Sequence, residues 1–301
     1  KLPARICYNG LAFRHQPNEP HRPTQFYQAG VELLGLEDSA AAEIEIMSLA
    51  VQALQVVGLK DFDMKVGDLG LFGALVDALD VPSQWRARLK RHFWRAGYFE
   101  ALLNRLTHGA STDTQRLLGS LGGLSQSESH AAIEGLMDMV ADAPQGARTR
   151  EEIVERLMEQ AADAAALRLD SKIAKVITSL LNVSGTAQAA MAEIRTLTSN
   201  AGVKLDAPLA AMEARLAALG SLGVDPSRVT FAARFGRNME YYTGFVFELW
   251  SHDAEGPVQV AGGGRYDTLM EALGARQATP AIGCALRTER VLAARRFAGV
   301  A

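Results

Sequence analysis

The 301-residue chain has few cysteines and no histidines at metal-type spacing. Cys7 and Cys284 are its only cysteines and lie far apart in sequence, which excludes a disulfide-rich scaffold and favours a reducing compartment. We therefore expect a cytoplasmic protein. The six histidines are scattered, so we expect neither a metal site nor a bound cofactor.

The sequence also lacks a surplus of positive charge and a long apolar run. Its net charge of −3 gives no global field that would attract nucleic acid. No apolar run approaches the ~18 residues that a membrane-spanning helix needs. The chain begins at Lys1 rather than at a methionine, so we expect a further N-terminal segment in the native protein. What is present, 48% hydrophobic and 22% charged residues, is typical of one large or two medium globular domains.

Residues 5–15 and 25–34 predict two strands, joined by a polar loop that contains three prolines. Because side chains alternate along a strand, Gln28 and Glu32 flank Gly30 on one face of the second strand. This face would be a polar floor with a bare gap in its middle, where a small zwitterion could place its ammonium near Glu32. The alternative is the solvent-facing side of an ordinary antiparallel sheet.

The middle of the chain differs from its two ends. Residues 83–225 are rich in Ala and Leu, have helical periodicity and carry almost no strand signal. We therefore expect an α+β core made of residues 1–82 and 226–301, interrupted by a helical insertion over 83–225. A basic run between Arg86 and Arg95 is interpreted as a solvated helix face, with a partner contact as the alternative. The other elements expected are a helix that Ser39 caps, a strand over 61–69, a helix over 70–79, and then strands over 229–235 and 241–250, a helix over 266–273 and a strand over 281–286.

Two stretches near the C-terminal end combine aromatic residues, arginine and glycine. They read RNMEYYTGFVFE over residues 237–248 and AGGGRYD over residues 261–267. Tyr241 and Tyr242 beside Arg237 can hold a small polar molecule by stacking and hydrogen bonding. Glycines such as Gly262 and Gly263 let a backbone approach a ligand closely. The alternative is that the tyrosines pack a strand and the glycines form a turn.

Three separated stretches resemble the catalytic core of histidyl-tRNA synthetase, a class II synthetase. FRH at residues 13–15 with QFYQAGVE at residues 25–32 resembles motif 2 of that family. Residues 237–242 resemble its histidine-specific signature, and AIGCALRTER at residues 281–290 resembles motif 3. The resemblance covers both ends of the chain in the family's order. It implies a class II synthetase-like antiparallel sheet flanked by helices.

The resemblance further implies a histidine-binding pocket, whose members differ in the part of the ligand they contact. They are Arg14 at the carboxylate, Gln28 and Glu32 at the ammonium, Arg237 at the reacting carboxylate and phosphate of a synthetase, and Tyr241, Tyr242, Gly262 and Gly263 around the imidazole.

Departures from the synthetase pattern predict a degenerate ATP site. Gln16 stands where the family has an acidic residue, and Thr24 where it has an arginine that holds phosphate. Arg287 stands where a glycine leaves room beside the nucleotide, although the motif 3 arginine, Arg290, is retained. Because adenylation depends on positioning and charge stabilisation of the phosphates, we expect that this activity is lost.

The chain also ends shortly after motif 3, where a synthetase continues into an anticodon-binding domain. A synthetase-like core without tRNA machinery is similar to the regulatory subunits of ATP phosphoribosyltransferase. This resemblance implies a non-catalytic chain that partners the short-form catalytic subunit in the first step of histidine biosynthesis and takes part in feedback control by histidine. It also implies a dimer formed through the core, and no binding of tRNA or membrane. The alternatives are a core that still makes histidyl-adenylate and a stand-alone histidine sensor.

Overall fold

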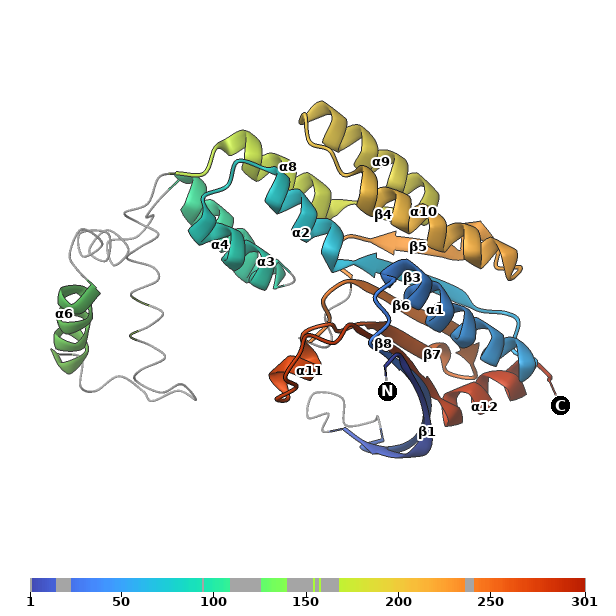
Figure 1. Ribbon diagram of the computed structural model, residues 1–301. Helices are drawn as coiled ribbons and strands as arrows, with labels where there is room; N and C mark the ends of the chain where they lie inside the picture. The colour runs from blue at the N-terminus through green and yellow to red at the C-terminus, as the bar shows by residue number, and fades with distance from the viewer. Residues whose placement is uncertain are drawn as a thin grey trace. The chain divides into compact units, whose positions relative to one another are not determined.

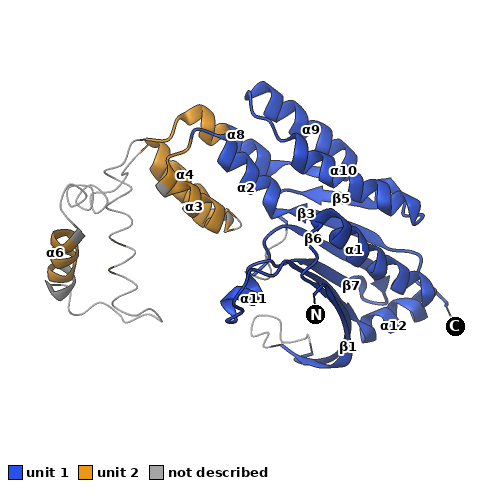
Figure 2. Ribbon diagram, viewed as in Figure 1, with its two compact units in different colours: residues 1–80, 176–301 blue, residues 81–175 orange. Residues whose placement is uncertain are grey.

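A computed structural model describes residues 2–14, 23–93, 95–108, 126–139, 154, 157, 168–235 and 241–300. The chain divides into two compact units, one of residues 1–80 with 176–301 and one of residues 81–175 (Figure 2). Helices α3 Ser83–His92, α4 Ala96–His108 and α6 Gln126–Met139 belong to the second unit. The first unit contains the sheet and carries the candidate site.

Among the described residues of the first unit, eight strands form one sheet in the order β1-β2-β8-β7-β6-β3-β5-β4 (Figure 1). Neighbouring strands are antiparallel except for the parallel pair β3–β5. With its flanking helices this is the predicted α+β architecture. The strands are β1 Ala4–Phe13, β2 Gln25–Leu34, β3 Asp63–Asp68, β4 Ser184–Thr186, β5 Val229–Ala232, β6 Phe245–Asp253, β7 Gly256–Arg265 and β8 Ala281–Arg287.

One face of this sheet forms the core with helix α1, Ser39–Val56. Phe245 and Phe247 of β6 are each 1% exposed, and Sγ of Cys284 in β8 lies 3.9 Å from the backbone oxygen of Ile46 in α1. This contact places α1 on the Cys284 face, where burial of apolar side chains stabilises the unit. The N-cap of α1 is Asp38 rather than Ser39, because the Asp38 carboxylate accepts a hydrogen bond of 3.0 Å from the backbone N–H of Ala41.

The remaining elements of the first unit complete the layer around the sheet. Helix α9 packs against β4 and β5, and α10 packs against α1 and α2. The predicted insertion over 83–225 therefore differs from the compact second unit, because residues 176–225 cluster with the sheet. The elements are α2 Leu69–Ala78, α8 Ser171–Asn182, which crosses the boundary between the units, α9 Ala187–Asn200, α10 Asp206–Ser221, the short 3-10 helix η1 Pro226–Arg228, α11 Leu269–Ala272 and α12 Thr288–Phe297.

The structure corrects three element boundaries near the aromatic stretches. β6 begins at Phe245 rather than at residue 241, because residues 241–244 form a turn and irregular backbone, although the N–H of Thr243 still donates to the oxygen of Arg265 at 2.8 Å. α11 begins at Leu269 rather than at residue 266, because the Tyr266 N–H donates to the oxygen of Ala281, the first residue of β8. The strand over 229–235 ends at residue 232.

β4 was not predicted at all. It pairs antiparallel with β5 through the small residues around Gly185. Three such residues give no hydrophobic alternation, so their pairing is determined by the neighbouring strand.

Two absences hold for the described part of the chain. None of its helices combines the length and apolar character needed to cross a membrane. Its His, Cys, Asp and Glu side chains form no group of three or more that could hold a metal ion.

Candidate functional site

The sheet face opposite α1 has a floor of small residues. Glu32 of β2 is paired with Gly283 of β8, which is paired with Gly264 of β7. Gly30 lies two residues before Glu32 and Gly262 two residues before Gly264, so both glycines lie on the same face of the sheet as Glu32, because side chains alternate along a strand. Without Cβ atoms at these positions, larger side chains can lie flat on the sheet.

Polar and aromatic side chains occupy that space. A Cβ at Gly283 would lie 1.6 Å from Oε2 of Glu32, and one at Gly30 would lie 2.4 Å from Cζ of Tyr8. The bare gap predicted at Gly30 is therefore wrong, because Tyr8, which pairs with Gly30 across β1 and β2, covers it. The hydroxyl of Tyr8 accepts a hydrogen bond of 2.7 Å from Nε2 of Gln28.

A pocket of ≈ 290 Å³ opens beside Glu32. Among the described residues that line it, Glu32 is the one charged side chain, and the Tyr266 hydroxyl donates a hydrogen bond to Oε2 of this carboxylate. A single carboxylate between aromatic and aliphatic walls suits a small ligand that has N–H donors and a flat ring. The lining residues are Ile6, Glu32, Leu34, Tyr241, Tyr266, Leu269 and Met270.

Electrostatics makes the pocket receptive to a cation. Burial raises the pKa of Glu32, and the hydrogen bond from Tyr266 only partly offsets that effect. Burial and the Glu32 carboxylate together raise the pKa of Tyr266, which keeps its hydroxyl protonated as a donor. A positively charged group placed against Glu32 would replace the lost hydration of the carboxylate.

Three tyrosines, called the pocket tyrosines below, cluster at this site: Tyr241 and Tyr266, which line the pocket, and Tyr242, whose ring packs against that of Tyr241. The ring centroids of Tyr241 and Tyr242 are 4.9 Å apart, and those of Tyr241 and Tyr266 are 5.8 Å apart at an angle of 85°. Burial raises the pKa of Tyr241, whereas the nearby charge of Arg14 lowers it. Of the residues predicted to bind a ligand, Glu32 and Tyr241 line this pocket, and the ring of Tyr242 packs against that of Tyr241. Their role in ligand binding stays a prediction.

The remaining predicted ligand residues differ in their positions. Gln28 is bonded to Tyr8 and is absent from the pocket lining. Gly262 lies on the open face, but Gly263 lies on the α1 face, where a Cβ would be 2.7 Å from that of Cys284. Arg237 falls outside the described residues.

Three of the predicted ATP residues are described: Thr24 directly precedes β2, Arg287 ends β8 and Arg290 lies in the first turn of α12. The Cζ atom of Arg287 lies 4.3 Å from the ring centroid of Phe26, so the guanidinium covers one face of that ring. Nη1 of Arg290 donates to the backbone oxygen of Gln259 at 3.2 Å. The backbone oxygen of Thr24 accepts from the N–H of Arg14 at 2.8 Å. Gln16 falls outside the described residues.

Two site residues escaped the sequence analysis, Tyr8 and Tyr266. The contact of Tyr8 with Gly30 depends on the register in which β1 and β2 pair, which the sequence alone does not determine. Tyr266 was assigned to a helix because it follows the glycine run, and its contact with Glu32 depends on long-range pairing that local sequence does not encode.

Known proteins that are similar to this chain have the same fold and identify its family. The family model of histidyl-tRNA synthetase matches residues 1–170 and 133–291. A structure titled ATP phosphoribosyltransferase regulatory subunit/histidyl-tRNA synthetase from Bacillus halodurans has a TM-score of 0.59 at 23% identity, over 98% of this chain and 59% of that chain. Histidyl-tRNA synthetase from Nostoc sp. PCC 7120 has a TM-score of 0.55 at 14% identity, over 100% of this chain and 56% of that chain. The fold is thus that of a class II histidyl-tRNA synthetase.

The curated relatives are closer in sequence. The ATP phosphoribosyltransferase regulatory subunit of Agrobacterium fabrum is 34% identical, over 97% of this chain and 77% of that protein. Those of Allorhizobium ampelinum and Rhizobium meliloti are each 35% identical, over 97% and 96% of this chain and 78% and 76% of those proteins. Identity at this level along nearly the whole chain shows common descent, and the chain belongs to the family of ATP phosphoribosyltransferase regulatory subunits.

Proposed function

We propose that this chain binds histidine in the Glu32 pocket and regulates a separate, short-form catalytic subunit of ATP phosphoribosyltransferase, without catalysing a reaction itself. The observation that carries the proposal is the pocket: one half-buried carboxylate, Glu32, with the pocket tyrosines beside it. Family membership supports the regulatory role, because the curated relatives are named regulatory subunits.

Histidine fits the chemistry of this pocket. Its ammonium is a cation with N–H donors for Glu32, and its imidazole is a flat ring that can lie against tyrosine side chains. Arg14, whose charge is felt at Tyr241, is the candidate partner for the ligand carboxylate. A free amino acid would thus have each of its charged groups opposite a residue of the other sign.

Feedback control follows if histidine binds one assembly state more tightly than another. A ligand shifts an equilibrium only by the difference between its affinities for the two states. By linkage, the catalytic subunit would then change the affinity of this chain for histidine by the same factor. We further propose that the complex is cytoplasmic and that this chain self-associates through its core.

The test is reconstitution of the full-length protein with a short-form catalytic subunit from the same source. We expect phosphoribosyl transfer only after mixing, and a several-fold decrease in turnover when histidine is added. Turnover by the catalytic subunit alone at the same rate would contradict the regulatory role. Histidine-dependent pyrophosphate exchange by this chain alone would instead identify an adenylating enzyme. Histidine binding without any effect on the catalytic subunit would identify a stand-alone sensor.

Arg287→Gly should strengthen ATP binding at the predicted degenerate nucleotide site. The guanidinium of Arg287 covers the Phe26 ring, and its removal would free both the ring face and the space beside it. Titration calorimetry with ATP in the presence of histidine measures the effect. Arg276→Gly is the matched control, because Arg276 lies exposed in the loop between α11 and β8. Unchanged ATP binding in Arg287→Gly would show that this arginine does not block the nucleotide site.

A further inference from the structure

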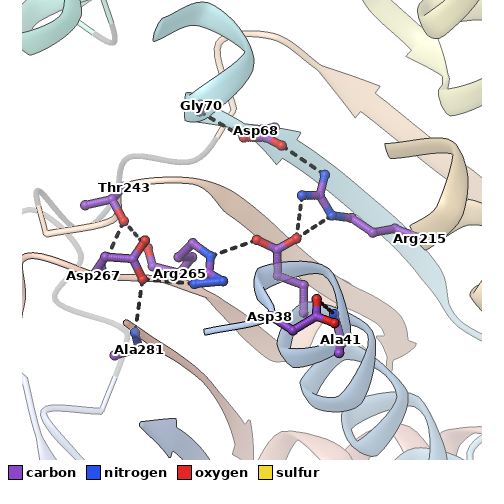
Figure 3. Close-up of polar contacts among 10 residues, drawn as sticks. Asp38, Ala41, Asp68, Gly70, Arg215, Thr243, Arg265, Asp267 and Ala281 are labelled. Atoms are coloured by element: carbon purple, nitrogen blue, oxygen red, sulfur yellow. Dashed lines mark hydrogen bonds and ion pairs between the residues drawn. The ribbon is translucent and has the colours of Figure 1, made fainter. Parts of the chain in front are cut away.

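On the α1 side of the sheet, a buried chain of ion pairs runs from α10 to the end of β7 (Figure 3). We call it the buried ion-pair chain: Arg215, Glu43, Asp68, Arg265 and Asp267. Arg215 donates to Glu43 at 2.7 Å and to Asp68 at 2.9 Å. Arg265 donates to Glu43 at 2.8 Å and to Asp267 at 2.9 Å. All of these side chains except that of Asp267 are at most 8% exposed.

At Asp267 the buried ion-pair chain reaches a point where two backbone segments meet, residues 241–243 and residues 265–267. Oδ1 of Asp267 accepts from the Ala281 N–H at 3.0 Å, and the N–H of Asp267 donates to Oγ1 of Thr243 at 3.0 Å. The N–H of Thr243 in turn donates to the backbone oxygen of Arg265 at 2.8 Å. Figure 3 shows Thr243, Arg265, Asp267 and Ala281 converging at this point.

All of the pocket tyrosines are carried by these two segments. Tyr241 and Tyr242 directly precede Thr243, and Tyr266 stands between Arg265 and Asp267. Residues 241–244 precede β6, and two backbone hydrogen bonds hold them: the Thr243 N–H donates to the oxygen of Arg265 at 2.8 Å, and the oxygen of Gly244 accepts from the Leu69 N–H at 3.1 Å. The Thr243–Asp267 bond thus joins the segment with two tyrosines to the segment with the third.

The energetics of the chain point to positioning more than to stability. Buried ion pairs are weak stabilisers, because desolvation of the charges offsets much of their attraction. Among the described residues, Nη2 of Arg265 has no hydrogen-bond partner, so the cluster is not fully satisfied. Its geometry is nevertheless fixed, since one carboxylate, Glu43, is shared by both arginines.

We propose that Thr243 and Asp267 are positioning residues, which hold the pocket tyrosines in the arrangement that binds histidine while the buried ion-pair chain supports them. The inference rests on the proposed histidine binding. Without the Thr243 hydroxyl, the segment that carries Tyr241 and Tyr242 would populate other arrangements. The apparent affinity would then decrease in proportion to the fraction that remains competent to bind.

A pair of variants tests the proposal. Thr243→Val keeps the side-chain shape and removes the hydroxyl, and it should weaken histidine binding about tenfold, as expected for an unpaired Asp267 N–H. Thr243→Ser keeps the hydroxyl and removes a methyl group, and it should bind within about twofold of the wild type. Calorimetric titration with histidine gives the affinities, and urea unfolding of the unliganded variants shows whether stability follows the same order.

The outcomes separate positioning from packing and from failure of the proposed function. If the wild type binds histidine and Thr243→Val binds equally well, the positioning role is overturned. It is also overturned if the serine variant is weakened as much as the valine variant, because lost packing would then explain both. If the wild type does not bind histidine, the proposed function fails, and the inference fails with it. If Thr243→Val does not fold, Thr243→Ala removes the hydroxyl without adding bulk, and we expect it to weaken histidine binding by the same factor.

Discussion

Replacing Glu32 by glutamine should weaken histidine binding about a hundredfold, since truncating one partner of a buried charged pair costs about 3 kcal/mol. Glutamine keeps the size of the side chain and an oxygen that can accept from the Tyr266 hydroxyl, so the pocket should keep its shape. What is lost is the negative charge opposite the ligand's N–H donors. Calorimetric titration of both proteins with histidine, at low and high salt, measures the loss.

The same substitution should stabilise the empty protein at neutral pH. Burial raises the pKa of Glu32 in the folded state, so the ionised carboxylate opposes folding wherever the pH lies above that raised value. As the pH falls from above the folded pKa towards the ordinary glutamate value of about 4.5, Glu32 becomes protonated in the folded state before it does in the unfolded state. The difference in unfolding free energy between the wild type and Glu32→Gln therefore becomes smaller. Urea unfolding without histidine at about pH 8 and about pH 5 should show a gap that narrows on acidification.

Glu45→Gln is the matched control, because the environment shifts Glu45 in the opposite direction. The hydrogen bond from Arg5 lowers the pKa of Glu45, so its ionised form favours folding and its replacement should be slightly destabilising. A Glu32→Gln variant that bound histidine like the wild type would remove Glu32 from the ligand site. One that was less stable than the wild type at about pH 8 would contradict the raised pKa.

The strand pair that carries Glu32 was predictable because its signals are local. The strand over 25–34 is confirmed at both ends, and the alternation that places Gln28 and Glu32 on one face follows from a period of two. Loop prolines and a polar run marked its start. Local patterns of this kind determine the class of the fold and the candidate residues.

Long-range pairing determined what the sequence analysis missed. The ring of Tyr8 lies over Gly30 only because β1 and β2 adopt one register, and Tyr266 reaches Glu32 only because β8 lies between β2 and β7. Thr243 was predicted in a strand and Asp267 in a helix, and neither assignment indicated that the two residues are hydrogen-bonded to each other or that Asp267 accepts from Ala281. A local propensity cannot report a contact made by residues that are distant in sequence.

The buried ion-pair chain is a further case, and it leads to the largest expected change in stability. Arg215→Met should destabilise the protein by about 3–5 kcal/mol, because removing one partner of a buried network leaves its carboxylates uncompensated. Glu43 would keep Arg265, whereas Asp68 would lose its only cationic partner among the described residues. Against a total stability of about 5–15 kcal/mol, the loss should be plain in urea unfolding.

Two further variants decide whether lost charge pairing is the cause. Arg195→Met removes an arginine from an ion pair with Glu213 in which both side chains are about half exposed, and it should cost at most about 1 kcal/mol. Asp68→Asn in the Arg215→Met background keeps the oxygen that accepts from the Gly70 N–H at 2.8 Å and removes the unpaired charge, so it should restore part of the stability. Because burial already raises the pKa of Asp68, acidification should partly rescue Arg215→Met in the same way. If Arg215→Met is as stable as Arg195→Met, the buried ion-pair chain contributes nothing to stability. If Arg215→Met is destabilised and neither Asp68→Asn nor a lower pH restores stability, the cause is lost packing on Phe245, because the Arg215 guanidinium lies 4.6 Å from the centroid of that ring.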